Sequence, residues 1–195
     1  MTRKTHGQEA RGLDPDGELV ARAQTELPFV DSAYEELMLR HERIMFQVCQ
    51  RLLDRPEDAA EVVQEVMLKV YHHLVSFEGR SKFKTWLMQI VRRECFTYYK
   101  KNKQINRHTS VDEFSGIENL HTGLASSDHD KTDNQIRASQ ILAAIDFDDR
   151  QILTLRFIAD LDLAEISEVL DLKLSATKMR LYRALDRARS IAGDQ

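Results

Sequence analysis

Residues 160 to 189 contain two adjacent segments of opposite charge, and this order limits the folds open to the chain. The first segment carries acids at helical spacing: Asp160, Asp162, Glu165, Glu168 and Asp171. The second carries bases against only one acid, Asp186: Lys178, Arg180, Arg183, Arg187 and Arg189. Phosphate groups would repel the first segment and attract the second. The order therefore predicts a helix-turn-helix whose second helix faces DNA.

Apolar residues support this prediction independently of charge. Each segment has an apolar stripe at helical spacing: Leu163, Ile166, Val169 and Leu170 in the first, and Met179, Leu181, Tyr182 and Leu185 in the second. Ser175 is the predicted N-cap of the second helix. Asp171 occupies the turn, where Gly is usual, and Asp is one of the few other residues that tolerate a left-handed backbone. An ordinary charged helical hairpin is the alternative, and the segregation of charge argues against it.

One segment accounts for the formal net charge of −4. Residues 104 to 134 contain two bases against six acids: Arg107 and Lys131 against Asp112, Glu113, Glu118, Asp128, Asp130 and Asp133. Because the segment lacks periodicity and is rich in polar residues, it predicts a flexible acidic linker. We therefore expect an all-α chain of two small helical domains, 17–103 and 135–195, behind a disordered tail at 1–16.

Apolar residues make up 42% of the chain, enough for small helical cores but without a membrane span. No run approaches the roughly 18 apolar residues that a spanning helix needs. The first 17 residues, MTRKTHGQEARGLDPDG, also lack the apolar stretch of a secretory signal. We expect a cytoplasmic protein without membrane insertion.

Residue types that often form reactive sites are sparse. Cys49 and Cys95 lie far apart in the sequence and have no CxxC partner, so buried free thiols are expected. His72 and His73 are adjacent and therefore point to different faces of a helix. No Ser-His-Asp set, glycine-rich phosphate loop or metal-ligand spacing is recognisable. We expect a binding protein that is not an enzyme and needs no metal or other cofactor.

Four helices are predicted before the linker: 17–26, 31–53, about 56–75 and 83 to about 103. The last begins apolar and ends with bases and aromatic residues. Such a mixture suits nucleic acid with exposed bases, because rings stack on bases and cations hold phosphates. Alternatively, these rings only complete the core. The acidic patch at Glu57, Asp58, Glu61 and Glu65 is either a partner surface or a solvated helix face.

Three motifs in order resemble bacterial sigma factors of the extracytoplasmic-function group. DAAEVVQEVMLKVY (58–71) resembles the family's DAEDLVQETFLRVW, and FKTWLMQIVRRECFTYYKK (83–101) resembles its FxxWLxxIAxNxxxDxxRK. LRFIADLDLAEISEVLDLKLSATKMRLYRAL (155–185) resembles its LRYxEGLSYEEIAxxLGxSxGTVKSRLxRA. The resemblance covers most of the chain and implies two domains, usually called region 2 and region 4.

This resemblance also implies partners: core RNA polymerase, promoter DNA and an anti-sigma protein, which in this group commonly clamps the two domains. The polymerase surface would be Asp58, Glu61, Gln64 and Glu65. The minus-10 promoter element would bind, as an opened strand, to Phe77, Arg80, Lys82, Arg92, Arg93, Tyr98, Tyr99, Lys100 and Lys101. The duplex minus-35 element would bind to Ser175, Lys178, Arg180 and Arg183.

Two other classes of protein remain as alternatives. A stand-alone helix-turn-helix regulator would share the basic second helix, but it should dimerise, and no dimerisation helix is evident. An enzyme acting on nucleic acid would need a catalytic set that the sequence does not display.

Overall fold

The computed structural model describes residues 14–53, 55–109, 140–142 and 144–193, and within α5 it describes side chains only to Lys103. All regular structure in these ranges is helical. The helices are α2 (Gly17–Glu26), α3 (Ser32–Leu52), α4 (Pro56–His73), the short 3-10 helix η1 (Leu74–Ser76), α5 (Phe83–Thr109), α7 (Phe147–Phe157), α8 (Leu163–Leu170) and α9 (Leu174–Gly193). The predicted all-α class is confirmed.

The first four predicted helices appear at nearly the predicted positions. The first matches α2, the second is one residue shorter at each end, and Pro56 begins α4 as expected. Apolar residues every three to four positions specified these helices. However, α5 continues to Thr109, six residues past its predicted end and into the segment expected to be linker.

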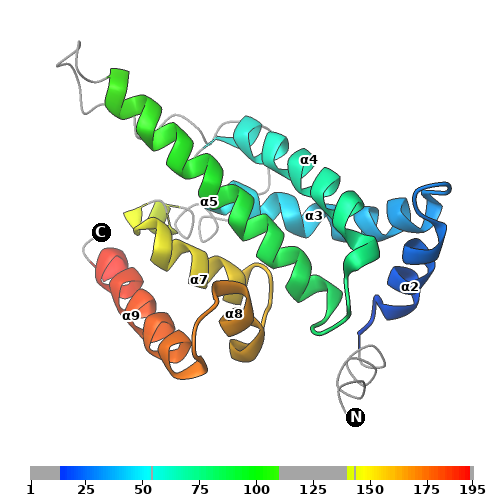
Figure 1. Cartoon of the computed structure of the whole chain (residues 1–195). Coiled ribbons are helices and arrows are strands. Elements are labelled where there is room, and N and C mark those ends of the chain that lie inside the picture. Colours follow the sequence, from blue (N-terminus) through cyan, green and yellow to red (C-terminus); the bar gives the residue numbers. More distant parts are fainter. Residues whose placement is uncertain (1–13, 54, 110–139, 143, 194–195) are drawn as a thin grey trace, which may run out of the picture.

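Helices α2 to α5 pack into an N-terminal unit, in which the long α5 lies beside α4 and α3 (Figure 1). Large side chains from two helices, α3 and α5, are fully buried here: Leu37, Met45, Leu52, Phe83, Leu87 and Met88. Cys49 on α3 and Cys95 on α5 are buried free thiols, as predicted, with their Sγ atoms 3.6 Å apart.

Helices α7, α8 and α9 form a C-terminal unit that contains the predicted helix-turn-helix. Asp162 caps α8 by accepting from the backbone N–H groups of Ala164 and Glu165, each at 2.8 Å. The Glu165 carboxylate in turn accepts from Asp162 N, which completes a capping box. Ser175 is not the N-cap of α9, because α9 begins at Leu174. Its first backbone bond runs from Thr177 N to the carbonyl of Lys173, one residue before the helix.

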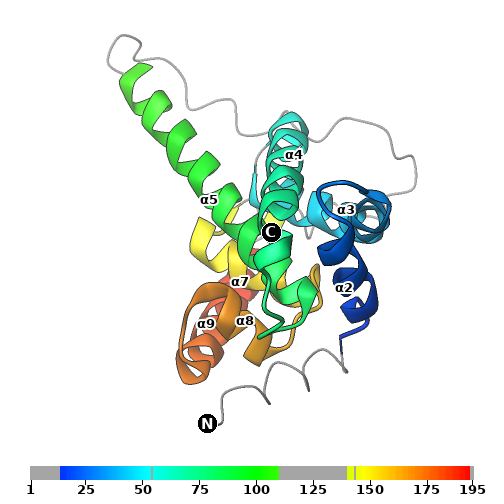
Figure 2. The same ribbon diagram turned by 45° about the vertical axis from the view of Figure 1, so that its right-hand side comes forward.

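The two units pack directly against each other. Helix α8 contacts α5, and α7 contacts α3, so one hydrophobic cluster extends through both units. Figure 2 shows α8 beside the first half of α5, and α9 packs on α7 and α8. Two separate small cores were expected from the sequence. The packing differs because apolar residues at the start of α7, notably Ile145 and Phe147, are buried in the shared cluster.

The last three residues of the predicted N-terminal tail, 14–16, lie within the described structure. Asp14, Pro15 and Asp16 form a defined turn before α2, and the Asp16 side chain is buried. Residues 1–13 and most of the predicted linker lie outside the described residues. Within the described ranges, no helix is both long and apolar enough to cross a membrane.

The turn of the helix-turn-helix carries the expected backbone conformation. Asp171 has φ 53° and ψ 49°, in the left-handed region that favours Gly. Its backbone N–H donates to the carbonyl of Glu168, which ends α8. A side chain that branches at Cβ fits this conformation poorly.

We predict that Asp171→Val lowers the free energy of unfolding by about 1–2 kcal/mol, whereas Asp171→Gly does not lower it. Urea denaturation of both variants measures the difference. Lys173→Val, two residues later at an exposed position, is the matched control. Equal destabilisation by Asp171→Val and Lys173→Val would contradict the assignment.

Candidate nucleic-acid and polymerase interfaces

One face of α4 is acidic and exposed. Glu61, Gln64 and Glu65 are all exposed at helical spacing, and Leu68, 56% exposed, continues the same face. Asp58 is different, because it is only 7% exposed. The structure therefore brings three of the four predicted polymerase-binding residues to the surface, with an apolar residue beside them that the sequence reading omitted.

Asp58 holds α4 to α5 instead of facing a partner. Its Oδ1 accepts from Arg55 Nη2 at 2.8 Å and from the Tyr98 hydroxyl at 2.8 Å. Burial, and then this hydrogen bond, raise the pKa of Tyr98, which keeps the phenol protonated as a donor. The structure therefore joins Asp58, predicted for the polymerase surface, to Tyr98, predicted for the minus-10 surface, and both assignments stay predictions.

A five-residue loop, Glu78–Lys82, connects η1 to α5 and presents two predicted minus-10 residues, Arg80 and Lys82, to solvent. Gly79 has φ 67°, a conformation that only Gly adopts without strain. Phe77 precedes the loop and is 8% exposed, with its ring centroid 4.9 Å from that of Trp86. The Phe77 ring therefore supports the loop from inside the core, and its role in minus-10 binding stays a prediction.

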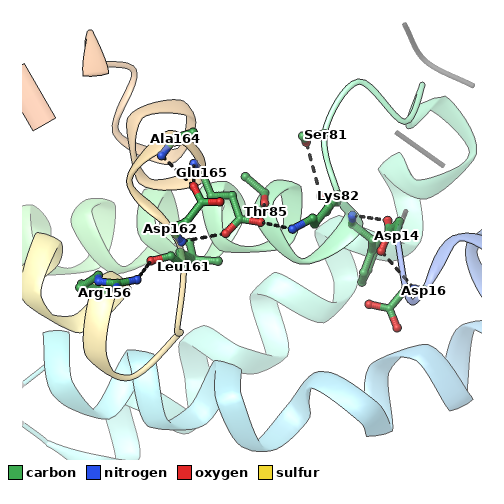
Figure 3. A network of polar contacts seen from close by, with 11 residues as sticks. Asp14, Asp16, Ser81, Lys82, Thr85, Arg156, Leu161, Asp162, Ala164 and Glu165 are labelled. Carbon is green, nitrogen blue, oxygen red and sulfur yellow. Dashed lines mark hydrogen bonds and ion pairs between the residues drawn. The ribbon is translucent and has the colours of Figure 1, made fainter. Parts of the chain in front are cut away.

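Lys82 contacts the C-terminal unit. Its Nζ donates to Glu165 Oε1 at 2.9 Å, and Figure 3 shows the two side chains meeting between α5 and α8. Glu165 is the same residue that completes the α8 capping box. The acidic helix of the helix-turn-helix thus lies against the start of α5, where Lys82 pairs with one of its carboxylates. This contact gives Glu165 a role within the protein.

The later part of α5 presents the remaining predicted minus-10 cations. Arg93, Lys100 and Lys101 are exposed. Arg92 is half-buried and donates from Nε to Gln151 Oε1 on α7 at 3.0 Å. Burial, and then the nearby charge of Arg180, lower the pKa of Arg92. Arg92, predicted for the minus-10 element, and Arg180, predicted for the minus-35 element, are therefore close together here.

Aromatic contacts join the same part of α5 to α7. The Tyr99 ring stacks on Phe147 with centroids 4.3 Å apart and planes 13° from parallel. The Phe96 ring lies 5.9 Å from Phe147, which is 7% exposed. Stacked rings of this kind contribute about 0.5–1.5 kcal/mol beyond their buried area. Tyr99, predicted to stack on a DNA base, here stacks on a protein ring.

The basic face of α9 is divided. Ser175, Lys178 and Arg183 are exposed, and neither cation forms an ion pair with a residue that the structure describes. Arg180 is only 26% exposed at its side chain and pairs with Asp148 at 3.2 Å. Arg187 pairs with Asp149 at 2.6 Å, and its second nitrogen lies 3.3 Å from Asp146. Only part of the predicted minus-35 surface is thus open.

The start of α7 supplies these acidic partners. Asp146 is its N-cap and accepts from Asp149 N at 2.9 Å. Burial and the charge of Asp146 raise the pKa of Asp149, whereas Arg187 lowers it. Sequence reasoning missed these residues. The string DFDD (146–149), an N-cap followed by acids in a first turn, was the available signal.

An open groove of about 720 Å³ lies between α5, the start of α7 and α9. Its lining includes Tyr99 and Lys103 from α5, and Met179, Arg180 and Arg183 from α9. The groove therefore places residues predicted for the minus-10 element beside residues predicted for the minus-35 element. The two predicted DNA surfaces face one space in this arrangement.

Comparisons with known proteins agree with this geometry. The sigma-70 region 2 family matches residues 37–105, and the sigma-70 region 4 family matches residues 136–187. These matches define a sigma factor with a region 2 unit followed by a region 4 unit. Together with the relatives described next, they show that the chain belongs to the extracytoplasmic-function group of RNA polymerase sigma factors.

Curated relatives cover most of the chain. It is 29% identical over 161 residues to the ECF RNA polymerase sigma-E factor of Haemophilus influenzae, covering 78% of this chain and 83% of that protein. It is 26% identical over 159 residues to the sigma-E factor of Escherichia coli K12, covering 78% and 82%. These matches do not favour the alternative of a stand-alone helix-turn-helix regulator.

Two solved structures have the same fold at 21% identity each. A structure of CnrH in complex with the cytosolic domain of CnrY matches with a TM-score of 0.69 over 93% of this chain and 99% of that chain. The sigma factor RpoE in complex with the anti-sigma factor NepR, from Bartonella quintana, matches with a TM-score of 0.66 over 84% and 98%. Matches of this extent include both units together.

We predict that Phe147→Ala separates the two units, because it removes the ring that contacts both Phe96 and Tyr99. The radius of gyration of the free chain should rise by several ångströms in small-angle X-ray scattering, with helix content retained. Phe157→Ala, at the other end of α7 and 61% exposed, is the control and should leave the radius unchanged. An unchanged radius in folded Phe147→Ala would show that this ring does not hold the units together.

Proposed function

We propose which surface of this promoter-recognising sigma factor binds each of its partners. The exposed α4 face at Glu61, Gln64, Glu65 and Leu68 binds core RNA polymerase. The Glu78–Lys82 loop and the exposed cations of α5 bind the opened minus-10 strand. The first turns of α9 enter the major groove of the minus-35 duplex.

The observation that carries this proposal is the separation of charge on exposed faces. The carboxylates of α4 project from one helix, whereas the cations Arg80, Arg93, Lys178 and Arg183 belong to the loop, α5 and α9. A surface of one charge sign attracts the partner of opposite charge and repels the partner of like charge. Polymerase and DNA can therefore bind to different surfaces at the same time. Core enzyme with this chain should therefore start run-off transcripts on promoters from a genomic library, and a chain that binds core but starts none would contradict the proposal.

The packed arrangement cannot bind both elements. Positions 35 and 10 base pairs upstream of the start are separated by about 25 base pairs, or roughly 85 Å of B-form DNA. Tyr99 and Arg183 line one groove instead. Arg92, Tyr99 and Arg180 also each contact a side chain of α7. We infer that α7–α9 leave α5 when the chain engages polymerase and a promoter.

An anti-sigma protein is the proposed inhibitor, and it would hold the packed arrangement. Support comes from the two solved structures of similar fold, whose partners are the cytosolic domain of CnrY and the anti-sigma factor NepR. A partner that contacts both units stabilises the packed state by its binding free energy, and so lowers the population able to bind DNA. The chain itself acts in the cytoplasm by binding, without a catalytic step of its own.

We predict that Glu65→Lys weakens binding to core RNA polymerase at least about tenfold, because a reversed charge in an electrostatic interface turns attraction into repulsion. Binding of each variant to surface-immobilised core enzyme measures the affinity. Glu42→Lys, the same reversal at an exposed position of α3, is the matched control and should bind as wild type. Equal losses in the two variants would indicate a general charge effect and contradict the assigned face.

We predict that Lys178→Ala weakens binding of the holoenzyme to duplex DNA containing the minus-35 element. One lost phosphate contact should also reduce the slope of log affinity against log salt concentration by about 1. Arg189→Ala, near the end of the same helix and paired with Asp186, is the control. An unchanged salt slope in Lys178→Ala would remove this residue from the DNA surface.

A further inference from the structure

The segment Asp14–Gln24 contacts both ends of the Glu78–Lys82 loop, although it lies more than 50 residues earlier in the sequence. At the start of the loop, Gln24 Nε2 donates to the carbonyl oxygens of Leu74 at 2.9 Å and Phe77 at 2.7 Å. At the end of the loop, Phe83 N donates to Asp14 Oδ2 at 2.6 Å. The two side chains thus fix the residues between which the loop is suspended.

The contact from Asp14 provides a hydrogen-bond acceptor that the start of α5 otherwise lacks. Lys82 precedes this helix, and its carbonyl accepts the first helical bond, from Trp86 N at 3.1 Å. A lysine cannot cap a helix N-terminus, because its side chain has no acceptor and its charge opposes the helix dipole. The Asp14 carboxylate supplies the missing acceptor and a negative charge. Lys82 is then able to point its amine away from the helix, toward an anion.

Asp16 anchors this segment to α3. Its Oδ1 accepts from Arg40 Nη1 at 2.8 Å, and its Oδ2 lies 2.8 Å from His41 Nε2. Burial raises the pKa of Asp16, but the bonds and charges of His41 and Arg40 outweigh burial and lower it overall, so Asp16 is a carboxylate. The His41 ring also packs against Phe83, with centroids 5.4 Å apart. Figure 3 shows Asp14 and Asp16 beside Lys82.

We propose that Asp14 and Gln24 are positioning residues for minus-10 recognition, which set the loop that presents Arg80 and Lys82 to the opened DNA strand. The proposal rests on the function proposed above for that loop. Neither residue touches DNA in this account. Each acts through the backbone at one end of the loop.

The test uses holoenzyme and one promoter recovered by run-off transcription from a genomic library. Transcript yield is measured on this promoter and on templates with single-base changes in the minus-10 element, and the ratio of the yields is the base preference. Gln24→Ala and Asp14→Ala should each reduce this preference about five- to tenfold. Core affinity and binding to minus-35 duplex should stay as in wild type. A purely structural defect would instead lower the yield on all templates equally and leave the preference intact.

Two further variants sharpen the result. Asp14→Asn keeps an oxygen that can accept from Phe83 N, so it should retain more of the base preference than Asp14→Ala. Thr25→Ala is the matched control on α2, because its hydroxyl donates only to Ala21 O in its own helix, at 3.0 Å. If Gln24→Ala impairs folding, the comparison of Asp14→Asn with Asp14→Ala decides the question.

Loop variants separate the two ways of failing. If Arg80→Ala or Lys82→Ala reduces the base preference but Gln24→Ala and Asp14→Ala do not, the positioning role is overturned and the loop assignment stands. If neither loop variant changes the preference, the minus-10 assignment of the loop fails, and the positioning role fails with it.

Discussion

The arrangement of this sigma factor depends on the contact between the basic, aromatic face of α5 and the C-terminal unit. Lys82 pairs with Glu165, Arg92 donates to Gln151, and Tyr99 stacks on Phe147. None of these contacts is strong alone. Lys82 remains 46% exposed in its ion pair, and such solvent-exposed pairs contribute at most about 1 kcal/mol. An interface made of several weak contacts can form and separate reversibly, as the proposed change of arrangement requires.

In the proposed function the same side chains serve both arrangements, because cations can pair with carboxylates or phosphates, and an aromatic ring can stack on a protein ring or on a base. In the packed state Glu165 takes the place proposed for a phosphate, and Phe147 takes the place proposed for a base. Glu165 is the acid of α8 that makes this contact. Burial, and then the like charge of Arg180, lower the pKa of Arg92 in this arrangement, and the proposed separation of the units would remove both causes.

Sequence patterns predicted much of this fold, because helices, their ends and the helix-turn-helix are local properties. The spacing of apolar residues gave α2, α3 and the start of α4 within a residue, and Asp171 has the predicted left-handed backbone. The DNA and polymerase surfaces remain predictions at the level of single residues, although most of the cations assigned to DNA are exposed.

Long-range contacts were not predictable from periodicity. The pairing of Lys82 with Glu165 and the capping of α5 by Asp14 join residues that are distant in sequence. The burial of Phe77 and Asp58 depends on contacts of the same kind. Charge patterns predicted that α8 and α9 differ in charge, but not that Glu165 of α8 would pair with Lys82 at the start of α5. Only the packing of the two units supplies that information.

The distance between the two units, measured with and without polymerase and promoter, tests the central claim most directly. Spin labels on cysteines introduced at Glu18 of α2 and Ser190 of α9, both exposed, would report it by pulsed electron paramagnetic resonance, since Cys49 and Cys95 are buried. The free chain should give one short, narrow distance distribution. The holoenzyme–promoter complex should give a distribution longer by tens of ångströms, in line with the roughly 85 Å between the two elements. An unchanged short distance in the active complex would contradict the account.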